Sequence, residues 1–403
     1  MLFSFKITLA QSSFNDSIVK INYPFLKLEA NKIQNDSIAL KSYYASLNKL
    51  QKDSLKVVSI LHIGDSHIQA DFFSGKLRQN YQLKYGNAGR GLVVPYRLAK
   101  TNEPSSYRFN GSSNFKSKKI VSKKDSLKVG ITGVTIEAQD SLSIINFKTF
   151  DQETLNYSFS KITILSQPSP NQMQVQLLDK DFCEIKNIEF ENRNSTNISV
   201  IKLENSTNEF YLKCYNPDSV KKMLFKAQGF ILENDSAGVL YHAVGVNGAE
   251  FRHYNDSPLF YEQLPLLNPS LIIISLGTND AYMPKFDTLA FVNNIQSMML
   301  SIKSQLPNAN FLFTTPGDSY RKRKAKNINM KIARNVIINY CMQNGYAYWD
   351  FYEIMGGFGS INKWFLKGLT SKDKLHLTRK GYELQGDILF KALQDGLERY
   401  SAN

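Results

Sequence analysis

The chain has 403 residues and a formal net charge of +14, and 42% of its residues are hydrophobic while 21% are charged. This composition is that of an ordinary globular protein, and it excludes a disordered or fibrous one. The length predicts two domains, or one domain with a large insertion. No stretch approaches the roughly 18 uncharged apolar residues needed to cross a bilayer, so we expect no transmembrane segment.

The excess of basic residues indicates attraction to polyanions, which include nucleic acid, an anionic membrane and an acidic glycan. The charge alone does not choose among them. Because no nucleic-acid-binding motif accompanies the charge, we expect no nucleic-acid partner. Nothing in the sequence predicts the oligomeric state.

The N-terminal segment, residues 1–50, begins with MLFSFKITLAQSS, which is apolar and carries one lysine. This pattern is typical of the end of a secretory signal, here cleaved after Ala10, and the alternative is a frayed amphipathic terminus. Under the first interpretation the protein is periplasmic or secreted.

The outer parts of the chain, residues 51–100 and 236–403, alternate strand-like runs with amphipathic helical patterns. Buried strands are predicted at residues 55–63, 238–246, 271–276, 310–315 and 346–351. Helices are predicted at residues 72–85, 257–267, 288–305, 324–343 and 381–397. The pattern predicts the α/β class, a doubly wound five-stranded parallel sheet whose ligands bind at the carboxyl ends of the strands.

The middle of the chain, residues 101–235, loses the helical period. Short alternating runs take over at residues 127–136, 142–147, 157–165, 173–178, 185–190, 198–203, 209–214 and 223–232. Eight short strands separated by turn residues predict an all-β sandwich, inserted after the first strand and helix of the outer domain. Its aromatic residues are candidates for stacking on sugars, although most should be core: Tyr107, Phe109, Phe115, Tyr157 and Phe159.

The strongest local signal is Gly64-Asp65-Ser66-His67, because it follows a predicted strand and precedes a predicted helix. A serine there projects from the carboxyl edge of the sheet, and its backbone N–H lies at a helix N-terminus, where negative charge is stabilised. These features suit a nucleophile. Taken alone, Gly-Asp-Ser is more often a turn with an N-cap.

A serine nucleophile needs a base, and the base needs an orienting carboxylate. Asp373-Lys374-Leu375-His376 supplies both on one short turn before the last predicted helix. Separated by three residues, Asp373 and His376 can meet side by side beneath the nucleophile. For this motif alone, a plain helix start is the alternative.

Acyl transfer also needs hydrogen-bond donors for the oxyanion of the tetrahedral intermediate. Gly248 follows the second predicted strand, and Asn279 follows the third. Glycine permits close approach of its N–H, and asparagine supplies a neutral amide donor. Singly, each is more often part of an ordinary turn.

The four pieces occur in order at the ends of successive strands or before the last helix, and this joint placement resembles the SGNH hydrolase superfamily. That resemblance implies a flavodoxin-like sheet, Ser66 as nucleophile, and His376 as base oriented by Asp373. It also implies an oxyanion hole formed by the N–H of Ser66 with Gly248 and Asn279. The chain is thus expected to be a carboxylic ester hydrolase that needs no cofactor.

A narrower resemblance rests on Gly64-Asp65-Ser66-His67, on LRQNYQLKYGNAGRGLVVP and on AYWDFYEIMGGFGSINKWF. These segments are similar to those of bacterial peptidoglycan O-acetylesterases, which also carry an inserted carbohydrate-binding-like β-sandwich. The resemblance implies an acetylated glycan as substrate and removal of its O-acetyl groups. Two alternatives remain: a polysaccharide O-acetyltransferase with the same triad, and a glycan- or polyanion-binding protein whose hydrolase domain is inactive.

Other candidates have simpler interpretations. His62, Asp65 and His67 are metal ligands by type, but strand residues alternate in direction and no third convergent histidine is evident, so no metal is expected. The basic run 321–326 is more consistent with a solvated helix face than with a polymer-binding site. Cysteines at three positions match neither a disulfide framework nor a metal motif, and one disulfide, between Cys183 and Cys214, is left open.

Overall fold

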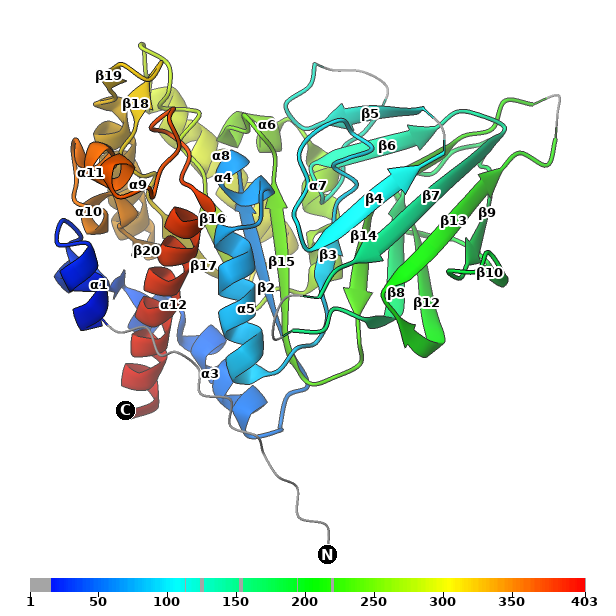
Figure 1. Ribbon diagram of the computed structural model, residues 1–403, viewed down its shortest axis with the longest axis horizontal. Helices are drawn as coiled ribbons and strands as arrows, with labels where there is room; N and C mark the ends of the chain where they lie inside the picture. Colours follow the sequence, from blue (N-terminus) through cyan, green and yellow to red (C-terminus); the bar gives the residue numbers. More distant parts are fainter. Residues whose placement is uncertain are drawn as a thin grey trace, which may run out of the picture.

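The computed structural model describes residues 16–112, 114–123, 127–151, 155–193, 195–218 and 221–402. It consists of an α/β part and a β-sandwich that lie side by side (Figure 1). The predicted signal remnant falls on residues outside the described ranges. No helix among the described residues is both long and apolar enough to cross a membrane.

The α/β part is built on a six-stranded sheet with the order β1-β20-β17-β16-β2-β15. Five strands are parallel, as predicted: β2 (Val57–Gly64), β15 (Gly238–Gly245), β16 (Leu271–Ser275), β17 (Asn310–Thr314) and β20 (Ala347–Trp349). The sixth strand, β1 (Ile33–Gln34), pairs with β20 in the antiparallel sense. It was not predicted, because a pair of residues carries no periodic signal.

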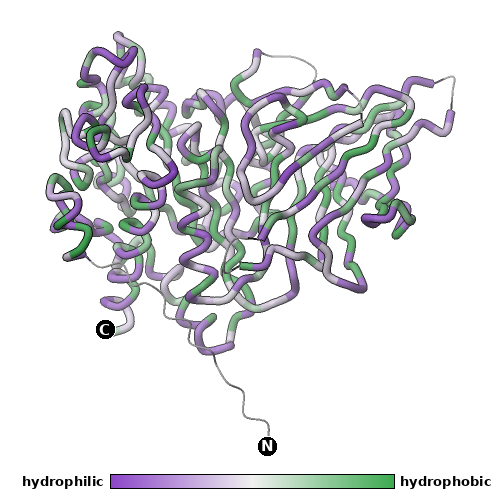
Figure 2. Tube along the Cα trace, viewed as in Figure 1, coloured by the Kyte–Doolittle hydropathy of each residue, from purple (hydrophilic) through white to green (hydrophobic). Residues whose placement is uncertain are grey.

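Helices cover both faces of this sheet, which agrees with the predicted doubly wound layout. One face is covered by α3 (Lys41–Gln51), α5 (Phe73–Tyr85) and α12 (Arg379–Ala402), and the other by α6 (Phe251–Asn255), α7 (Pro258–Glu262), α8 (Thr288–Gln305) and α9 (Asn329–Asn344). Successive residues of a strand face opposite sides of the sheet: Ile273 packs into the first core, whereas Ile272 and Ile274 pack into the second. Figure 2 shows these apolar segments in the interior of the α/β part.

Shorter elements complete the α/β part: α1 (Asp16–Asn22), η1 (Leu28–Ala30), α2 (Asp36–Ala39), α4 (Ser66–Gln69), η2 (Leu264–Leu267), β18 (Tyr320–Arg321), β19 (Ala325–Lys326), α10 (Phe351–Ile354) and α11 (Ser360–Leu366). The hairpin β18–β19 corrects one prediction. The basic run 321–326 lies in this hairpin and not on a helix, and α9 begins five residues later than the predicted residue 324. Lys322 and Arg323 have φ of 50° and 66°, a left-handed conformation that a helix cannot contain.

The insertion is a sandwich of two antiparallel sheets. One sheet has the order β10-β9-β13-β7-β4, and the other has the order β11-β12-β8-β14-β6-β5 with β3 paired to β14. The strands are β3 (Gly91–Val93), β4 (Tyr107–Gly111), β5 (Phe115–Lys119), β6 (Val134–Ala138), β7 (Leu142–Thr149), β8 (Phe159–Ser166), β9 (Gln174–Leu178), β10 (Glu184–Asn187), β11 (Glu191–Arg193), β12 (Thr196–Thr207), β13 (Glu209–Tyr215) and β14 (Phe225–Glu233).

Strand pairing crosses the predicted division of the chain at residue 101. β3 belongs to the sandwich sheet although it lies among residues assigned to the outer domain, because it pairs with Phe230, Ile231 and Leu232 on the edge of β14 opposite β8. The five aromatic residues considered for sugar stacking are all buried, between 0% and 7% exposed. Four of them, Tyr107, Phe109, Phe115 and Phe159, belong to the sandwich core, whereas Tyr157 contacts Arg78 of the α/β part. Cys183 is exposed and Cys214 is buried, and both are free thiols, so the disulfide left open by the sequence is not formed.

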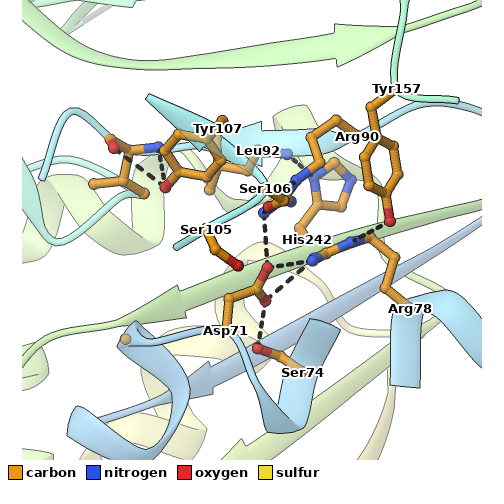
Figure 3. Close-up of polar contacts among 12 residues, drawn as sticks. Asp71, Ser74, Arg78, Arg90, Leu92, Ser105, Ser106, Tyr107, Tyr157 and His242 are labelled. Atoms are coloured by element: carbon orange, nitrogen blue, oxygen red, sulfur yellow. Dashed lines mark hydrogen bonds and ion pairs between the residues drawn. The ribbon is translucent and has the colours of Figure 1, made fainter. Parts of the chain in front are cut away.

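A buried charge cluster connects the sandwich to the α/β part (Figure 3). The Asp71 carboxylate accepts hydrogen bonds from Arg78 and, at 2.7 Å, from Nη2 of Arg90. Arg90 Nη2 also donates to Ser106 Oγ at 3.0 Å, and Arg78 Nε donates to the Tyr157 hydroxyl at 3.4 Å. Ser106 and Tyr157 belong to the insertion, so these hydrogen bonds link the insertion to the α/β part.

Candidate active site

The predicted nucleophile lies on a tight turn between β2 and α4. Ser66 is the first residue of α4, and the side chain of Asp65 caps this helix by accepting the N–H of His67 at 2.9 Å. Gly64 is required by space, because a Cβ there would lie 2.3 Å from the Ile68 side chain. The first N–H groups of a helix have no intrahelical acceptor, so the helix does not use the hydrogen bond of the Ser66 N–H.

Ser66, His376 and Asp373 form a continuous hydrogen-bonded chain. Ser66 Oγ lies 3.0 Å from His376 Nε2, and His376 Nδ1 lies 2.7 Å from Asp373 Oδ2. The other oxygen of Asp373 accepts the Ser371 hydroxyl at 2.5 Å and the backbone N–H groups of Leu375 and His376 at 2.9 and 3.0 Å. This is the donor and acceptor order in which an imidazole can take a proton from a serine hydroxyl.

The electrostatics of Asp373 suit an orienting carboxylate. Burial by itself raises its pKa, but hydrogen bonds from His376 and Ser371 outweigh burial and hold the pKa well below its ordinary value. The carboxylate therefore stays ionised through the mildly acidic range. An ionised Asp373 keeps the proton of His376 on Nδ1 and leaves Nε2 free to accept.

We expect Asp373→Asn to lower kcat for an acetyl ester by about 10⁴-fold, because an amide stabilises the wrong imidazole tautomer. Steady-state kinetics with an aryl acetyl ester checks this. Asp181→Asn is a matched control, since Asp181 is exposed in a loop of the insertion and should leave kcat unchanged. If the Asp373 variant kept more than a tenth of its kcat, Asp373 would not orient the base.

The two further donors predicted for an oxyanion lie on neighbouring turns. Gly248 has φ of 80°, and a Cβ added there would meet nothing within 4 Å, so its backbone borders open space. Asn279 Nδ2 donates to Asp65 Oδ2 at 3.1 Å and to the carbonyl of Ala249 at 2.9 Å. The Asn279 side chain thus links the turn that carries Ser66 to the turn that carries Gly248.

The Asn279 amide differs from the sequence-based expectation of a free donor, because both of its N–H groups have acceptors in this structure. Asn279 would stabilise an oxyanion only by sharing or releasing one of these hydrogen bonds. The hydrogen bond to Asp65 is the easier one to release. Burial raises the pKa of Asp65 to about 7, and a protonated carboxyl is a poorer acceptor than a carboxylate.

The raised pKa of Asp65 has a consequence for stability. The unfolded chain releases this proton near the ordinary value of about 4, whereas the folded protein holds it until about pH 7. Between these values the folded state binds more protons, so the free energy of unfolding falls as pH rises, and it levels off above pH 7. Urea unfolding at several pH values should show a smaller decline in Asp65→Asn than in wild type. Identical slopes would contradict the raised pKa.

Three residues near the triad were not identified from the sequence. Gln69 Oε1 accepts the N–H of Asn247 at 2.7 Å, and its Nε2 donates to the carbonyl of Asn102 at 2.8 Å. Ser371 donates to the carboxylate of Asp373, and the Tyr382 hydroxyl lies 2.8 Å from His67 Nδ1. These contacts join segments far apart in the chain, so no local sequence motif predicts them.

The alternative of a metal site is not supported by the positions of its candidate ligands. His62 Nδ1 lies 2.9 Å from the Tyr241 hydroxyl, and His62 Nε2 lies 2.7 Å from Ser275 Oγ. Hydroxyl groups therefore occupy both nitrogens of His62, and His67 is bonded to Tyr382. In the described ranges no group of three or more His, Cys, Asp and Glu side chains is placed to hold a metal ion.

Residues 226–384 match the model of the GDSL-like Lipase/Acylhydrolase family. The chain therefore contains a GDSL-like lipase/acylhydrolase domain, and the resemblance to SGNH hydrolases is confirmed at this level. The matched range includes Gly248, Asn279, Asp373 and His376, while Ser66 lies before it. No match is found among curated proteins.

The fold is similar to that of a solved peptidoglycan O-acetylesterase, with a TM-score of 0.74 and 19% sequence identity over 89% of this chain and 96% of that chain. Such coverage includes the inserted sandwich as well as the α/β part. Another similar structure is a lipase/acylhydrolase from Enterococcus faecalis, with a TM-score of 0.32 and 18% identity over 39% of this chain and 77% of that chain. A family two carbohydrate esterase from Clostridium thermocellum has a TM-score of 0.31 and 11% identity over 65% of this chain and 94% of that chain.

Proposed function

We propose that the protein is a serine esterase that removes O-acetyl groups from the sugars of cell-wall or other polysaccharides, through an acetyl-enzyme on Ser66. The observation that carries this proposal is the hydrogen-bonded chain from Ser66 through His376 to Asp373. The similarity in fold to a peptidoglycan O-acetylesterase supports the choice of an acetylated glycan. A periplasmic or secreted location goes with such a substrate and forms part of the proposal.

In the first half of the reaction, Ser66 Oγ attacks the acetyl carbonyl while His376 Nε2 accepts its proton. The negative charge that develops on the carbonyl oxygen is stabilised by N–H donors of Ser66 and Gly248, with Asn279 joining when its amide shares a hydrogen bond. His376 then returns the proton to the sugar oxygen as the C–O bond breaks. The sugar leaves with a free hydroxyl, and the acetyl group stays on Ser66.

In the second half, His376 takes a proton from water, which attacks the acetyl-enzyme. Collapse of the second tetrahedral intermediate releases acetate and returns the proton to Ser66. The chain's own residues supply every proton transfer. A sugar hydroxyl in place of water would give acetyl transfer by the same steps.

Acetate release from O-acetylated peptidoglycan, compared between wild type and Ser66→Ala, tests the proposal. We expect wild type to release acetate, and Ser66→Ala to release none. We also expect the rate of acetate release to exceed the rate of acetyl transfer to an added sugar acceptor. Transfer that outruns hydrolysis would make the protein an O-acetyltransferase. Binding of the glycan with no Ser66-dependent turnover would instead identify a glycan-binding protein.

A further inference from the structure

Three segments at the end of the α/β part away from the sandwich carry much of the chain's positive charge (Figure 1). They are residues 281–286, residues 319–328 with the β18–β19 hairpin, and residues 355–372 with α11, and we name them the basic end. Together they contain nine Lys and Arg residues and no Asp or Glu. Eight of the nine are exposed and Arg321 is half-buried, and none of them forms an ion pair with a described residue.

Contacts between the three segments place them next to one another. The backbone N–H of Lys322 donates to the Tyr282 hydroxyl at 3.0 Å, which joins the hairpin to the first segment. The Lys326 ammonium lies 5.3 Å from the centre of the Phe358 ring, which joins the hairpin to the third segment. The basic end is therefore one surface built from parts that are distant in the sequence.

The carboxylates that border the basic end are buried or engaged elsewhere. Asp318 interacts with Lys326, but its side chain belongs to a residue that is only 2% exposed. Asp287 caps α8, and Asp373 is bonded to His376. The basic end thus presents an excess of positive charge to solvent, and charge complementarity favours an anionic partner.

The hairpin keeps its cations at strained positions on an anchored base. Lys322 and Arg323 have φ of 50° and 66°, a conformation that glycine or asparagine adopts at lower cost. Asn327, at the end of the hairpin, is 1% exposed, and its amide donates to the carbonyl of Ala281 at 3.1 Å. The base of the hairpin is therefore fixed without any help from the charged side chains.

Exposed apolar side chains lie among these cations. Met283, Ile328 and Phe358 are 60%, 49% and 48% exposed, and each belongs to a different segment of the basic end. A polyanionic polymer would pair with the cations and leave these side chains in water. An anionic bilayer accepts both kinds of group, because its headgroups attract Lys and Arg while apolar side chains enter the boundary with the acyl chains.

We propose that the basic end docks the protein on a membrane surface that contains anionic lipids. The triad lies close to this surface, since the backbone N–H of Tyr320 in the hairpin donates at 2.8 Å to the carbonyl of Lys374, between Asp373 and His376. Docking would therefore hold the catalytic edge beside the lipid headgroups. The inference concerns where the protein acts, and it does not depend on which ester is cleaved.

Sedimentation with vesicles tests the proposal. The vesicles are phosphatidylcholine alone, or phosphatidylcholine with about one-third phosphatidylglycerol, and wild type should bind the anionic ones tighter by about tenfold or more. A hairpin variant replaces four exposed cations: Lys322→Gln, Arg323→Gln, Lys324→Gln and Lys326→Gln. It should lose most of this binding and keep the wild-type unfolding temperature, because the Asn327 anchor is unchanged.

A matched control makes the same change of charge on the sandwich. It replaces four exposed lysines: Lys116→Gln, Lys186→Gln, Lys202→Gln and Lys222→Gln. This variant should bind the anionic vesicles as wild type does. Equal losses in the two variants would show that only net charge matters, and equal binding of wild type to both kinds of vesicle would remove the role of anionic lipid. Either result would overturn the proposal.

Phe358→Ser separates a membrane from an anionic polymer. This substitution keeps every charge, so it should weaken vesicle binding severalfold and leave any binding to polyphosphate unchanged. Binding of wild type to polyphosphate without binding to the anionic vesicles would identify a polymer as the partner and overturn the membrane assignment. No binding to either would leave the basic end without an anionic partner and overturn the proposal as a whole.

Discussion

Ser66→Ala is expected to lower kcat for an acetyl ester by about 10⁴-fold or more, since removal of a triad nucleophile leaves only binding and oxyanion stabilisation. The structure supports this size of effect because Ser66 Oγ lies 3.0 Å from the base and sits on the first residue of a helix. Initial rates with an aryl acetyl ester, corrected for spontaneous hydrolysis, provide the measurement.

A matched control is Ser304→Ala, which removes an exposed hydroxyl at the far end of α8 and should leave kcat unchanged. Both variants should unfold at the wild-type temperature, because neither hydroxyl fills a core position. A Ser66→Ala protein that kept a tenth of the wild-type rate would remove Ser66 from the mechanism. The other residues of the turn would then need a different explanation.

The second large effect concerns stability. Asp71→Asn is expected to lower the free energy of unfolding by about 3–5 kcal/mol, because two buried arginines lose their shared carboxylate. Arg78 and Arg90 outweigh burial and hold the pKa of Asp71 below its ordinary value. The stabilisation from this carboxylate is therefore present above about pH 4 and is lost as pH falls through the lowered pKa. Urea unfolding followed by circular dichroism measures the change.

An exposed ion pair serves as the control for Asp71. Lys27 and Glu353 lie 2.5 Å apart with side chains 46% and 35% exposed, so Glu353→Gln should cost less than about 1 kcal/mol. If Asp71→Asn cost no more than Glu353→Gln, the cluster would not fasten the sandwich to the α/β part. Separate unfolding of the two parts in the Asp71 variant would be a further sign that the contact was lost.

Much of the α/β part could be predicted because its elements repeat a strong local signal. The helix predicted at residues 288–305 has the same bounds in the structure, where Asp287 caps it through the N–H groups of Leu289 and Ala290. The helix predicted from residue 324 was placed too early, because basic residues with good helix propensity form the β18–β19 hairpin instead. Helix propensity therefore predicts the start of a helix poorly where residues adopt a left-handed turn.

The insertion was predicted as a β-sandwich but not in all its strands. β4 (Tyr107–Gly111), β5 (Phe115–Lys119) and β11 (Glu191–Arg193) lie outside the predicted runs. β4 and β5 are short and contain few buried residues, and β11 is exposed throughout. β3 was missed because its partner, β14, lies more than 130 residues further along the chain. Pairing between such distant segments leaves no local pattern.

The predicted triad could be recognised because each member belongs to a short motif at a strand end or helix start. The structure brings Ser66, His376 and Asp373 together at hydrogen-bond distance. What the motifs could not predict is the state of Asn279, whose amide is engaged by Asp65 and Ala249. The charge cluster of Asp71, Arg78 and Arg90 could not be predicted either, because these residues come together only when they are buried against the insertion.

The central claim is an acetyl-enzyme on Ser66, and it is tested most directly by mass spectrometry of the enzyme quenched in acid during turnover of an aryl acetyl ester. Such an ester acylates quickly, so the covalent intermediate accumulates. We predict one acetyl group on the peptide that contains Ser66, absent from Ser66→Ala and lost when the substrate is exhausted. Acetate release with the acetyl group on another residue, or with no acetylated peptide at any quench time, would contradict the account.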